Sequence, residues 1–355
     1  MKTKLRDLLF PQQKSKIKAG EGKQEGKYKF FTSSPVQNKH IDVANYTKPA
    51  LIFGTGGNAS VHFCNEPFST STDCLVMFGR NEQELQTIYF FLRNNMYLLE
   101  GGFKGAGLKH ISKEYILDLS IELPSSTVQQ ELLQKASSIE SMVAKRKEQL
   151  AKLDQLVKSR FIEMFGDPVL NPQGWKTKPL LEMGNCKNGM NFHDGDEGVE
   201  INCLGVGDFK DLAIIDKTYE LPTISLNEAP PKEYLLKDGD IVFVRSNGNK
   251  ALVGRCLVVY PHDTPTTYSG FCIRYRLTTD ELETQYLLRV LKTESIRKKM
   301  AGRGANIQNL NQQILASLII PIPPKDLQQQ FAAFVEQADK SKYHSDSTYS
   351  MEVAA

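Results

Sequence analysis

A stretch of forty residues without glycine or proline, from Ser126 to Phe165, constrains this chain more than any other feature. Apolar side chains recur along it, mostly at steps of three and four, at Leu132, Ala136, Ile139, Val143, Leu150, Leu153, Val157 and Phe161. That spacing is typical of a coiled-coil seam rather than of the broad apolar face of a globular helix. Gly166-Asp167-Pro168 should end the helix, which at 1.5 Å per residue would span roughly 60 Å. The sequence therefore predicts a long spacer helix with an interaction seam.

Length and composition favour two soluble domains. A chain of 355 residues suits two cores, and the contents of 40% hydrophobic and 24% charged residues are typical of folded proteins. No apolar run of eighteen residues and no charged-then-apolar leader is present, so we expect neither a membrane span nor a secretory signal. Six cysteines without a C-x-x-C pair favour a reducing cytoplasm and thiols buried as small hydrophobes. The net charge of +3 permits a nucleic-acid partner without requiring one.

A long internal repeat lies on the two sides of this helix. KTKPLL at Lys176–Leu181 is similar to KTKLRD at Lys2–Asp7, and LKDGDIVFVRSNGN corresponds to ALIFGTGGN. Near the end of each copy the match has no gap, so that Gly105 falls on Gly304, Leu119 on Leu318 and Gln129 on Gln328. The repeat is too long for a solenoid unit and indicates two copies of one domain-plus-helix module. Each copy contains short β-like runs, a helical stretch and a closing strand.

We therefore expect an α+β fold with two globular mixed α/β domains separated by a long helix. The first domain is placed at residues 1–125, the spacer helix at 126–166, the second domain at 167–325 and a distal helix at 326–355. Heptad character fades near Tyr343, so the distal helix is expected to be shortened and to end in an irregular tail. Leu150, Leu153 and Val157 would then lie partly uncovered.

The sequence contains no set of residues that is typical of catalysis or of metal binding. The glycines of Ile52–Gly57 lack both the G-x-G-x-x-G spacing and the G-K-[ST] ending of nucleotide-binding loops. Six scattered histidines show no metal-ligand spacing, and no nucleophile motif is present. The paired carboxylates Asp194/Asp196 and Asp238/Asp240 have neighbouring glycines and are interpreted as turns. These observations favour a binding protein without a metal site.

Several loops carry residues suited to DNA. A lysine-rich segment near the N-terminus fits a phosphate-facing loop, Arg or Lys suits guanine, and Asn or Gln suits adenine in the major groove. Helices opening near Ser112 and Asn311 could offer free N–H groups to phosphate. The alternative, that these residues are simply turn formers, stays open at each position. The candidate DNA-binding residues are Lys14, Lys16, Lys18, Thr55, Asn58, Lys104, Lys109, His110, Asn188, Asn191, Arg245, Asn247, Asn249, Arg303, Asn306, Gln308 and Asn309.

Five stretches carry a resemblance to a known family. AKRKEQLAKLDQLVKSRFIEMFGDPVLNPQGW resembles the central conserved region of the specificity (S) subunit of type I restriction–modification systems. GDIVFVRSNGN and LIIPIPPKDLQQQF resemble its target recognition domains and the entry to its helices. PQQKSKIKAGEGKQEGKYKFFTSS with LIFGTGGNAS is similar to a common variety of first recognition domain.

This resemblance implies a non-catalytic DNA-recognition subunit. Two target recognition domains would each read half of a split site in double-stranded DNA, held apart by two conserved helices packed as an antiparallel coiled coil. The helices would fix the gap between half-sites and dock two methyltransferase subunits, to which restriction subunits add. S-adenosylmethionine, ATP and Mg²⁺ would belong to those partners, with no cofactor in this chain. The residues proposed for the subunit interface are Leu132, Ile139, Val143, Leu150, Leu153, Val157 and Phe161.

Two other interpretations stay open. One is a DNA methyltransferase that carries its own recognition domains, which would need a cofactor fingerprint and an Asn-Pro-Pro-Phe tetrapeptide; Asn65-Glu66-Pro67-Phe68 lacks one of the prolines. The other is an inactive or silent truncated specificity subunit, which the shortened distal helix suggests. Co-purification with a methyltransferase subunit would separate that possibility from an active subunit.

Overall fold

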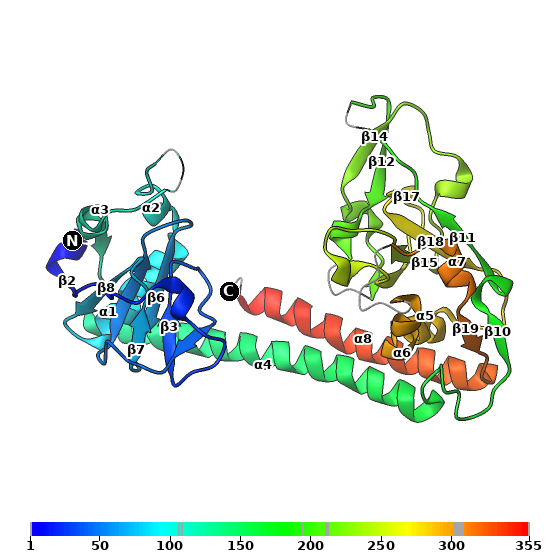
Figure 1. Cartoon of the computed structure of the whole chain (residues 1–355), viewed down its shortest axis with the longest axis horizontal. Coiled ribbons are helices and arrows are strands. Elements are labelled where there is room, and N and C mark those ends of the chain that lie inside the picture. The colour runs from blue at the N-terminus through cyan, green and yellow to red at the C-terminus, as the bar shows by residue number, and fades with distance from the viewer. Residues whose placement is uncertain are drawn as a thin grey trace. The chain divides into compact units, whose positions relative to one another are not determined.

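The computed structural model of the chain divides into two compact units, Met1–Arg146 and Lys147–Ala355. It describes residues 2–105, 107, 109–193, 195–209, 213–301 and 309–353, with the backbone alone described at 301 and 343–353. Both units combine sheets with helices, and the 40-residue helix α4 (Ser126–Phe165) joins them (Figure 1). This confirms the predicted α+β class and the predicted bounds of the long helix. No helix among these residues is long and apolar enough to cross a membrane.

The first unit contains a four-stranded antiparallel sheet and a smaller three-stranded sheet. The orders are β2-β8-β5-β6 and β4-β3-β7, and β1 pairs with β9. The strands are β1 (Lys2–Lys4), β2 (Leu9–Pro11), β3 (Tyr28–Phe31), β4 (Lys39–Ile41), β5 (Ala50–Gly54), β6 (Ser60–Cys64), β7 (Phe68–Thr70), β8 (Cys74–Gly79) and β9 (Ser120–Glu122). The helices are α1 (Glu82–Asn94), α2 (Tyr97–Glu100) and α3 (Lys113–Asp118).

The central strand β5 is apolar throughout because both of its faces are covered. Leu51 and Phe53 belong to the apolar cluster that contains Ile88 of α1. The alternate residue Ile52 belongs to a second cluster with Phe68 of the three-stranded sheet. Successive side chains of a strand point to opposite faces, so a strand covered on both sides needs apolar residues at every position.

The second unit repeats this arrangement with longer elements. Its sheets have the orders β11-β18-β15-β16-β13 and β14-β12-β17, and β10 pairs with β19. The strands are β10 (Thr177–Pro179), β11 (Gly184–Asn188), β12 (Val199–Leu204), β13 (Ile214–Ile215), β14 (Thr223–Leu226), β15 (Asp240–Val244), β16 (Cys256–Val259), β17 (Thr266–Tyr268), β18 (Cys272–Leu277) and β19 (Ile319–Pro321). The helices are α5 (Thr284–Lys292), α6 (Glu294–Ala301), α7 (Gln312–Ala316) and α8 (Lys325–Val353).

The two units share one topology except for β13, which extends the sheet of the second unit, and this confirms the repeat seen in the sequence. The antiparallel pair β5·β8 corresponds to β15·β18, and the parallel pair β3·β7 corresponds to β12·β17. Ser112 and Asn311 cap α3 and α7 at equivalent places, accepting hydrogen bonds from Tyr115 N (3.1 Å) and Ile314 N (2.9 Å). A side-chain acceptor at this position satisfies an N–H group that has no partner within the helix.

A buried glutamine closes the junction between sheet domain and helix in both units. Gln129 Nε2 donates to Pro124 O at 2.9 Å, and Gln328 Nε2 donates to Pro323 O at 2.8 Å. The side chain of Gln328 also accepts a hydrogen bond from Glu283 N at 2.8 Å. A buried amide is costly unless its groups are paired, so each glutamine fixes where its helix leaves the domain.

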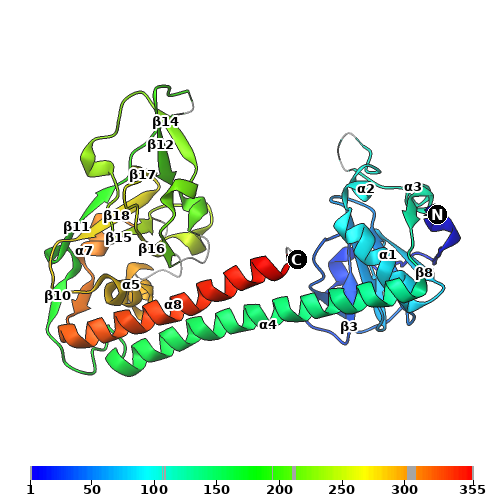
Figure 2. The ribbon, with the colours of Figure 1, turned by 180° about the vertical axis from the view of Figure 1, so that it is seen from behind.

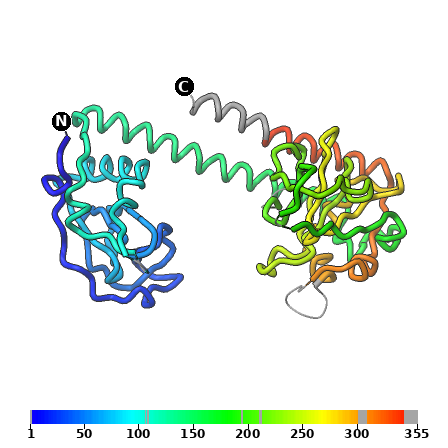
Figure 3. The backbone as a smooth tube through the Cα atoms, turned by 90° about the horizontal axis from the view of Figure 1, so that it is seen from above, coloured from blue at the N-terminus to red at the C-terminus, as the bar shows by residue number. Residues whose placement is uncertain are grey.

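In the second unit α8 packs antiparallel to the end of α4. Phe331, early in α8, contacts Phe161 and Phe165 with ring centroids 5.5 and 5.6 Å apart. Lys342, later in α8, pairs with Asp154, earlier in α4, through Nζ and Oδ1 at 2.7 Å. Contacts that advance along one helix while retreating along the other define an antiparallel pair. Figures 2 and 3 show α8 beside this part of α4.

Two expectations about this helix pair are wrong. The chain was expected to become irregular after Tyr343, but the backbone of α8 is helical to Val353. No glycine or proline interrupts α8, and serine or threonine lowers helix propensity without ending a helix. Val157 was expected to lie partly uncovered and is fully buried, because the last turns of α4 pack on the core of the second unit as well as on α8. Leu150 and Leu153 are half-buried.

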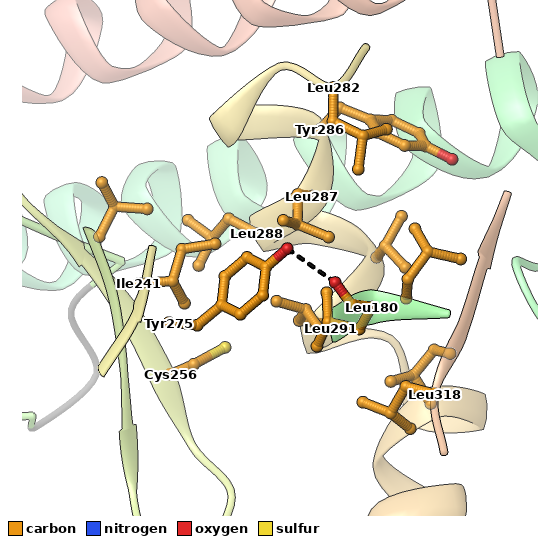
Figure 4. Packing of buried hydrophobic residues seen from close by; sticks show 14 of the residues in the cluster. Leu180, Ile241, Cys256, Tyr275, Leu282, Tyr286, Leu287, Leu288, Leu291 and Leu318 are labelled. Atoms are coloured by element: carbon orange, nitrogen blue, oxygen red, sulfur yellow. Dashed lines mark hydrogen bonds between the residues drawn. The ribbon is translucent and has the colours of Figure 1, made fainter. Parts of the chain in front are cut away.

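The core of the second unit lies between the sheet and α5. Figure 4 shows Tyr275 of β18 among Leu287, Leu288 and Leu291 of α5, with its hydroxyl donating to the backbone oxygen of Leu180, just after β10, at 3.0 Å. Cys256 lies in the same cluster, and burial raises the pKa of its thiol to about 11. All six cysteines are free thiols, and five of them are buried, which agrees with the prediction that they pack as small hydrophobes.

We predict that Phe161→Ala destabilises the second unit by about 3–5 kcal/mol, because it leaves a cavity among Phe165, Tyr286 and Phe331. Trp175 is the single tryptophan and its ring lies 5.8 Å from that of Phe165, so its fluorescence should report urea unfolding of this unit. The neighbouring Ile162→Ala is a matched control, since Ile162 is 51% exposed and its loss should cost under about 1 kcal/mol. An equal loss of unfolding free energy in the two variants would contradict the assignment of Phe161 to the aromatic core.

Candidate nucleic-acid interface

In the first unit the predicted loops meet at one end of the four-stranded sheet. Thr55 directly follows β5, and its backbone N and its Oγ1 both donate to Asp73 O at 2.9 Å. Ile111 N donates to Thr55 O at 3.1 Å, and Gly57 N donates to Lys109 O at 3.2 Å. The Thr55–Asn58 loop therefore lies against the loop that contains Lys104, Lys109 and His110.

The lysine-rich segment reaches the same end of the sheet. A pocket of about 660 Å³ is lined by Lys14, Thr55 and His110, together with the helix cap Ser112 and with Lys113. Thr72 N donates to Ile17 O at 2.9 Å, which holds the segment beside the turn that precedes β8. Lys16 and Lys18 are both exposed there. The structure thus brings the first-unit candidates of the sequence analysis onto one surface.

The chemistry of these residues differs from one to the next. Thr55 is only 8% exposed and its hydroxyl already donates to Asp73 O, so in this conformation it does not offer that hydroxyl to a base. His110 Nδ1 lies 3.1 Å from Thr55 O. A carbonyl oxygen only accepts, so Nδ1 must carry a proton, which leaves Nε2 as an acceptor in the neutral ring and a donor in the charged ring. The exposed lysines Lys14, Lys104 and Lys109 supply positive charge around this histidine.

In the second unit the equivalent end of the sheet is built around Arg245. This residue follows β15 as Thr55 follows β5, and Leu310 N donates to Arg245 O at 2.8 Å, which places the exposed Asn309 alongside. Arg245 N donates to Phe271 O at 2.7 Å, and its Nη1 donates to Gly270 O at 3.2 Å. The arginine is therefore held by the turn between β17 and β18.

A third predicted loop joins this turn from the other side. Gly270 N donates to Met190 O at 2.7 Å, and Gly189 N donates to Cys272 O at 3.1 Å. Asn188, half-buried at the end of β11, and the exposed Asn191 flank these two residues. The loops that contain Asn188 and Asn191, Arg245, and Asn309 are separate in the sequence and converge here.

Two candidate asparagines in the second unit are engaged in their own turn. Asn247 Oδ1 accepts a hydrogen bond from Asn249 N at 2.7 Å, and Asn249 Oδ1 accepts one from Ala251 N at 3.1 Å. A bidentate contact to adenine needs both the oxygen and the nitrogen of the amide. In this conformation each amide oxygen already accepts one bond within the turn, as the turn-forming alternative expects for both residues. Arg303, Asn306 and Gln308 lie outside the residues that the structure describes.

Sequence reasoning missed Phe271 and the pocket residues Gln12, Gln13 and Lys113. Phe271, the residue before β18, is 63% exposed although an apolar side chain would be expected to lie in the core. The repeat offers a signal for it, because Phe271 corresponds to the polar residue Asp73: each accepts the amide of the residue that follows the central strand. The pocket residues gave no local signal, since β2 brings Gln12 and Gln13 to this end only through its pairing with β8.

The described residues hold no group of three or more His, Cys, Asp or Glu side chains that could bind a metal ion. Asp238 and His262 form a pair, with Oδ2 and Nδ1 3.2 Å apart. Asp240 is buried and receives two hydrogen bonds from the guanidinium of Arg276, at 2.8 and 2.7 Å. Its Oδ2 also accepts one from Lys237 N at 2.7 Å, so it both forms the predicted turn and anchors β18. Asp194 lies outside the described residues.

The predicted seam of α4 divides into an exposed part and a buried part. Leu132 and Ile139 are 49% and 45% exposed, and Val143 is half-buried. Val157 and Phe161 are buried in the second unit's own core, so they are not a surface that another subunit could contact.

Comparisons with known proteins agree with this arrangement. The family model of the type I restriction modification DNA specificity domain matches residues 1–155 and 172–347. The chain is 26% identical over 267 residues to the type I restriction enzyme StySPI specificity subunit of Salmonella potsdam, an alignment that covers 70% of this chain and 56% of that subunit. It therefore spans about half the length of this curated relative.

Two solved structures share the fold at low sequence identity. The crystal structure of the type I restriction-modification system S subunit from M. genitalium is 16% identical, with a TM-score of 0.61, and the match covers 100% of this chain and 93% of that one. A chain from a structure on complex assembly and conformational transition of the type I R-M system is 15% identical, with a TM-score of 0.53 and the same coverage. The family match over most of the chain, in both halves of the repeat, confirms the resemblance seen in the sequence: the chain belongs to the type I restriction modification DNA specificity family.

Proposed function

We propose that this chain is the DNA-recognition subunit of a type I restriction–modification complex and that it binds a bipartite sequence in double-stranded DNA. The observation that carries the proposal is the equivalence of the two loop-bearing sheet ends. Thr55 and Arg245 occupy the same position of the repeat, and each accepts a backbone hydrogen bond from the loop that precedes α3 or α7. One backbone frame with different side chains would give two readers of two different half-sites.

We further propose that α4 docks the methyltransferase subunits, to which restriction subunits add. Val128, Leu132, Ile139 and Met142 are 42%, 49%, 45% and 47% exposed, and their steps of four, seven and three place them on one face of α4. Burying a large apolar side chain contributes on the order of 1.5–3 kcal/mol, so such a stripe favours a partner helix. Leu150 and Leu153, half-buried in the second unit, would extend this surface.

In this proposal the chain itself has no catalytic role. S-adenosylmethionine, ATP and Mg²⁺ would be held by the partner subunits, and the chain would supply only sequence recognition and assembly. The six free thiols are suited to a reducing compartment, and we propose the cytoplasm.

The first test separates a recognition subunit from a methyltransferase. We predict that the purified chain, given S-adenosylmethionine and DNA, transfers no methyl group, and that activity requires added methyltransferase subunits. Incorporation of tritiated methyl groups into DNA measures this directly. Methyl transfer by the chain alone would support the alternative of a methyltransferase with its own recognition domains.

The second test concerns DNA contacts in the assembled complex. Arg245→Ala should weaken binding to the specific site by about 1–3 kcal/mol and relax a single base position, if its guanidinium contacts a guanine. Lys16→Ala should weaken binding to all sequences and reduce the salt slope by about one, as expected for a phosphate contact. Fluorescence anisotropy against salt, together with mapping of methylated positions, distinguishes these patterns.

Arg160→Ala is the matched control for charge, because Arg160 lies on α4 and pairs with Glu163 rather than with a loop residue. It should leave the recognised sequence unchanged. If Arg245→Ala and Lys16→Ala leave both affinity and methylated positions unchanged, the assignment of these residues to DNA contact is wrong.

The third test concerns α4 as the spacer between half-sites. Four residues inserted between Lys147 and Leu150 add roughly 6 Å of helix, close to two base-pair steps. The insertion precedes Asp154, so the contacts of Asp154, Phe161 and Phe165 with α8 are retained. We predict unchanged half-sites with a longer gap between them, as measured by mapping methylated sites.

The same insertion between Glu228 and Ala229, an exposed loop of the second unit, is the control and should not alter the gap. An altered half-site with the original gap in the α4 variant would show that the helix does not set the spacing.

A further inference from the structure

The turn between β17 and β18 presents an aromatic side chain on a backbone that is fixed from several directions. Tyr268 and Cys272, at the two ends of the turn, are fully buried, whereas Phe271 is 63% exposed. Phe271 O accepts hydrogen bonds from Arg245 N at 2.7 Å and from Ser246 N at 3.3 Å. Gly270 N is held by Met190 O at 2.7 Å. The phenyl group is therefore exposed on a rigid support.

The exposure of Phe271 does not by itself indicate a function, because single apolar side chains are common on protein surfaces. What distinguishes Phe271 is its neighbour. The Arg245 guanidinium donates from Nη1 to Gly270 O at 3.2 Å, so the same turn holds both the arginine and the phenyl group. The loop of Asn191 also packs closely against this turn. A Cβ atom built on Gly270 would lie 2.1 Å from Asn191 Oδ1, so Asn191 is a third candidate residue at the turn.

We propose that Phe271 is a specificity-determining residue that contacts the 5-methyl group of a thymine in the major groove, beside the base pair contacted by Arg245. A phenyl ring has no hydrogen-bonding group, and thymine is the one standard base with an apolar group on its major-groove edge. Arg245 and Phe271 come directly after and directly before the paired residues Val244 and Cys272 of β15 and β18. Paired strands lie about 4.8 Å apart and base pairs about 3.4 Å apart, so the two side chains are spaced to reach adjacent base pairs. This inference rests on the proposed function.

The first unit carries different chemistry at the equivalent position. Asp73 O accepts the amide of Thr55 as Phe271 O accepts that of Arg245. A carboxylate accepts hydrogen bonds from the amino group of cytosine, whereas a phenyl group cannot. The two units therefore select different bases at this point of their half-sites.

The test uses the full chain assembled with methyltransferase subunits and a duplex containing the site first mapped from methylated positions. Replacing one thymine at a time by uracil removes only the methyl group. At one thymine of the half-site read by the second unit, uracil should weaken binding about fourfold, which corresponds to about 0.8 kcal/mol. The Phe271→Ala complex should lose this penalty, while Phe271→Leu, which keeps an apolar contact, should retain most of it.

Tyr219→Ala is the matched control, since Tyr219 is an equally exposed aromatic residue of the second unit, at 62%. It should keep the uracil penalty, and Trp175 fluorescence during urea unfolding should show that each variant is folded. A full uracil penalty in Phe271→Ala, or no penalty at any thymine in the unaltered complex, would overturn the proposal. Equal weakening of Phe271→Ala on all sequences would also overturn it, in favour of a wedge between bases. Absence of any sequence-specific binding by the unaltered complex would instead contradict the proposed function.

Discussion

The packing of Phe161 and Phe165 of α4 against Tyr286 and Phe331 is the interaction on which the rest of the second unit depends. Phe165 lies 4.8 Å from Tyr286 and 5.6 Å from Phe331, both in edge-to-face arrangements that favour aromatic pairs. These rings come from α4, α5 and α8, so one cluster joins the sheet domain to both long helices. Because the end of α4 is packed into the core, the direction of the helix is fixed relative to the second unit.

The two units reach the same geometry through backbone hydrogen bonds rather than through matching side chains. In each unit the backbone N–H of the residue after the central strand donates to the carbonyl of the residue that precedes β8 or β18. The carbonyl of the same residue accepts a backbone hydrogen bond from the loop that leads to α3 or α7. Those bonds do not depend on side-chain identity, so Thr55 and Arg245, or Asp73 and Phe271, can occupy one frame. A fixed frame with variable side chains is suited to recognising different sequences with one architecture.

The charges on the long helices have a simpler role. Glu148 pairs with Lys152 at 2.7 Å, and Glu336 pairs with Lys340 at 2.6 Å, each one helical turn apart. The neighbouring ammonium group lowers the pKa of each of these carboxyl groups. This is the behaviour of charged side chains on a solvated helix face. Lys14 of the N-terminal loop lies instead beside Thr55, His110 and Lys113, so positive charge gathers at one end of the sheet.

The sequence alone determined α4, the central strands β5 and β15, the capped starts of α3 and α7, and the internal repeat. All of these rest on local signals: apolar periodicity, capping residues, glycine and proline stops, and similarity between two stretches. The short strands β3, β4, β7, β14 and β17 and the burial of Val157 were decided by the tertiary structure, whereas the continuation of α8 to Val353 follows from its lack of glycine and proline. Strands of three or four residues carry too little pattern to be recognised, and burial depends on residues distant in the sequence.

The same division holds for the candidate site. Residue types suited to DNA could be read from the loops, and the fold places most of the described ones at the two sheet ends. The sequence did not determine that the oxygens of Asn247 and Asn249 are held in their own turn, or that Phe271 stands exposed beside Arg245. The hydrogen bonds of those asparagines depend on loop conformation, and the position of Phe271 depends on contacts among three loops that only the folded chain brings together.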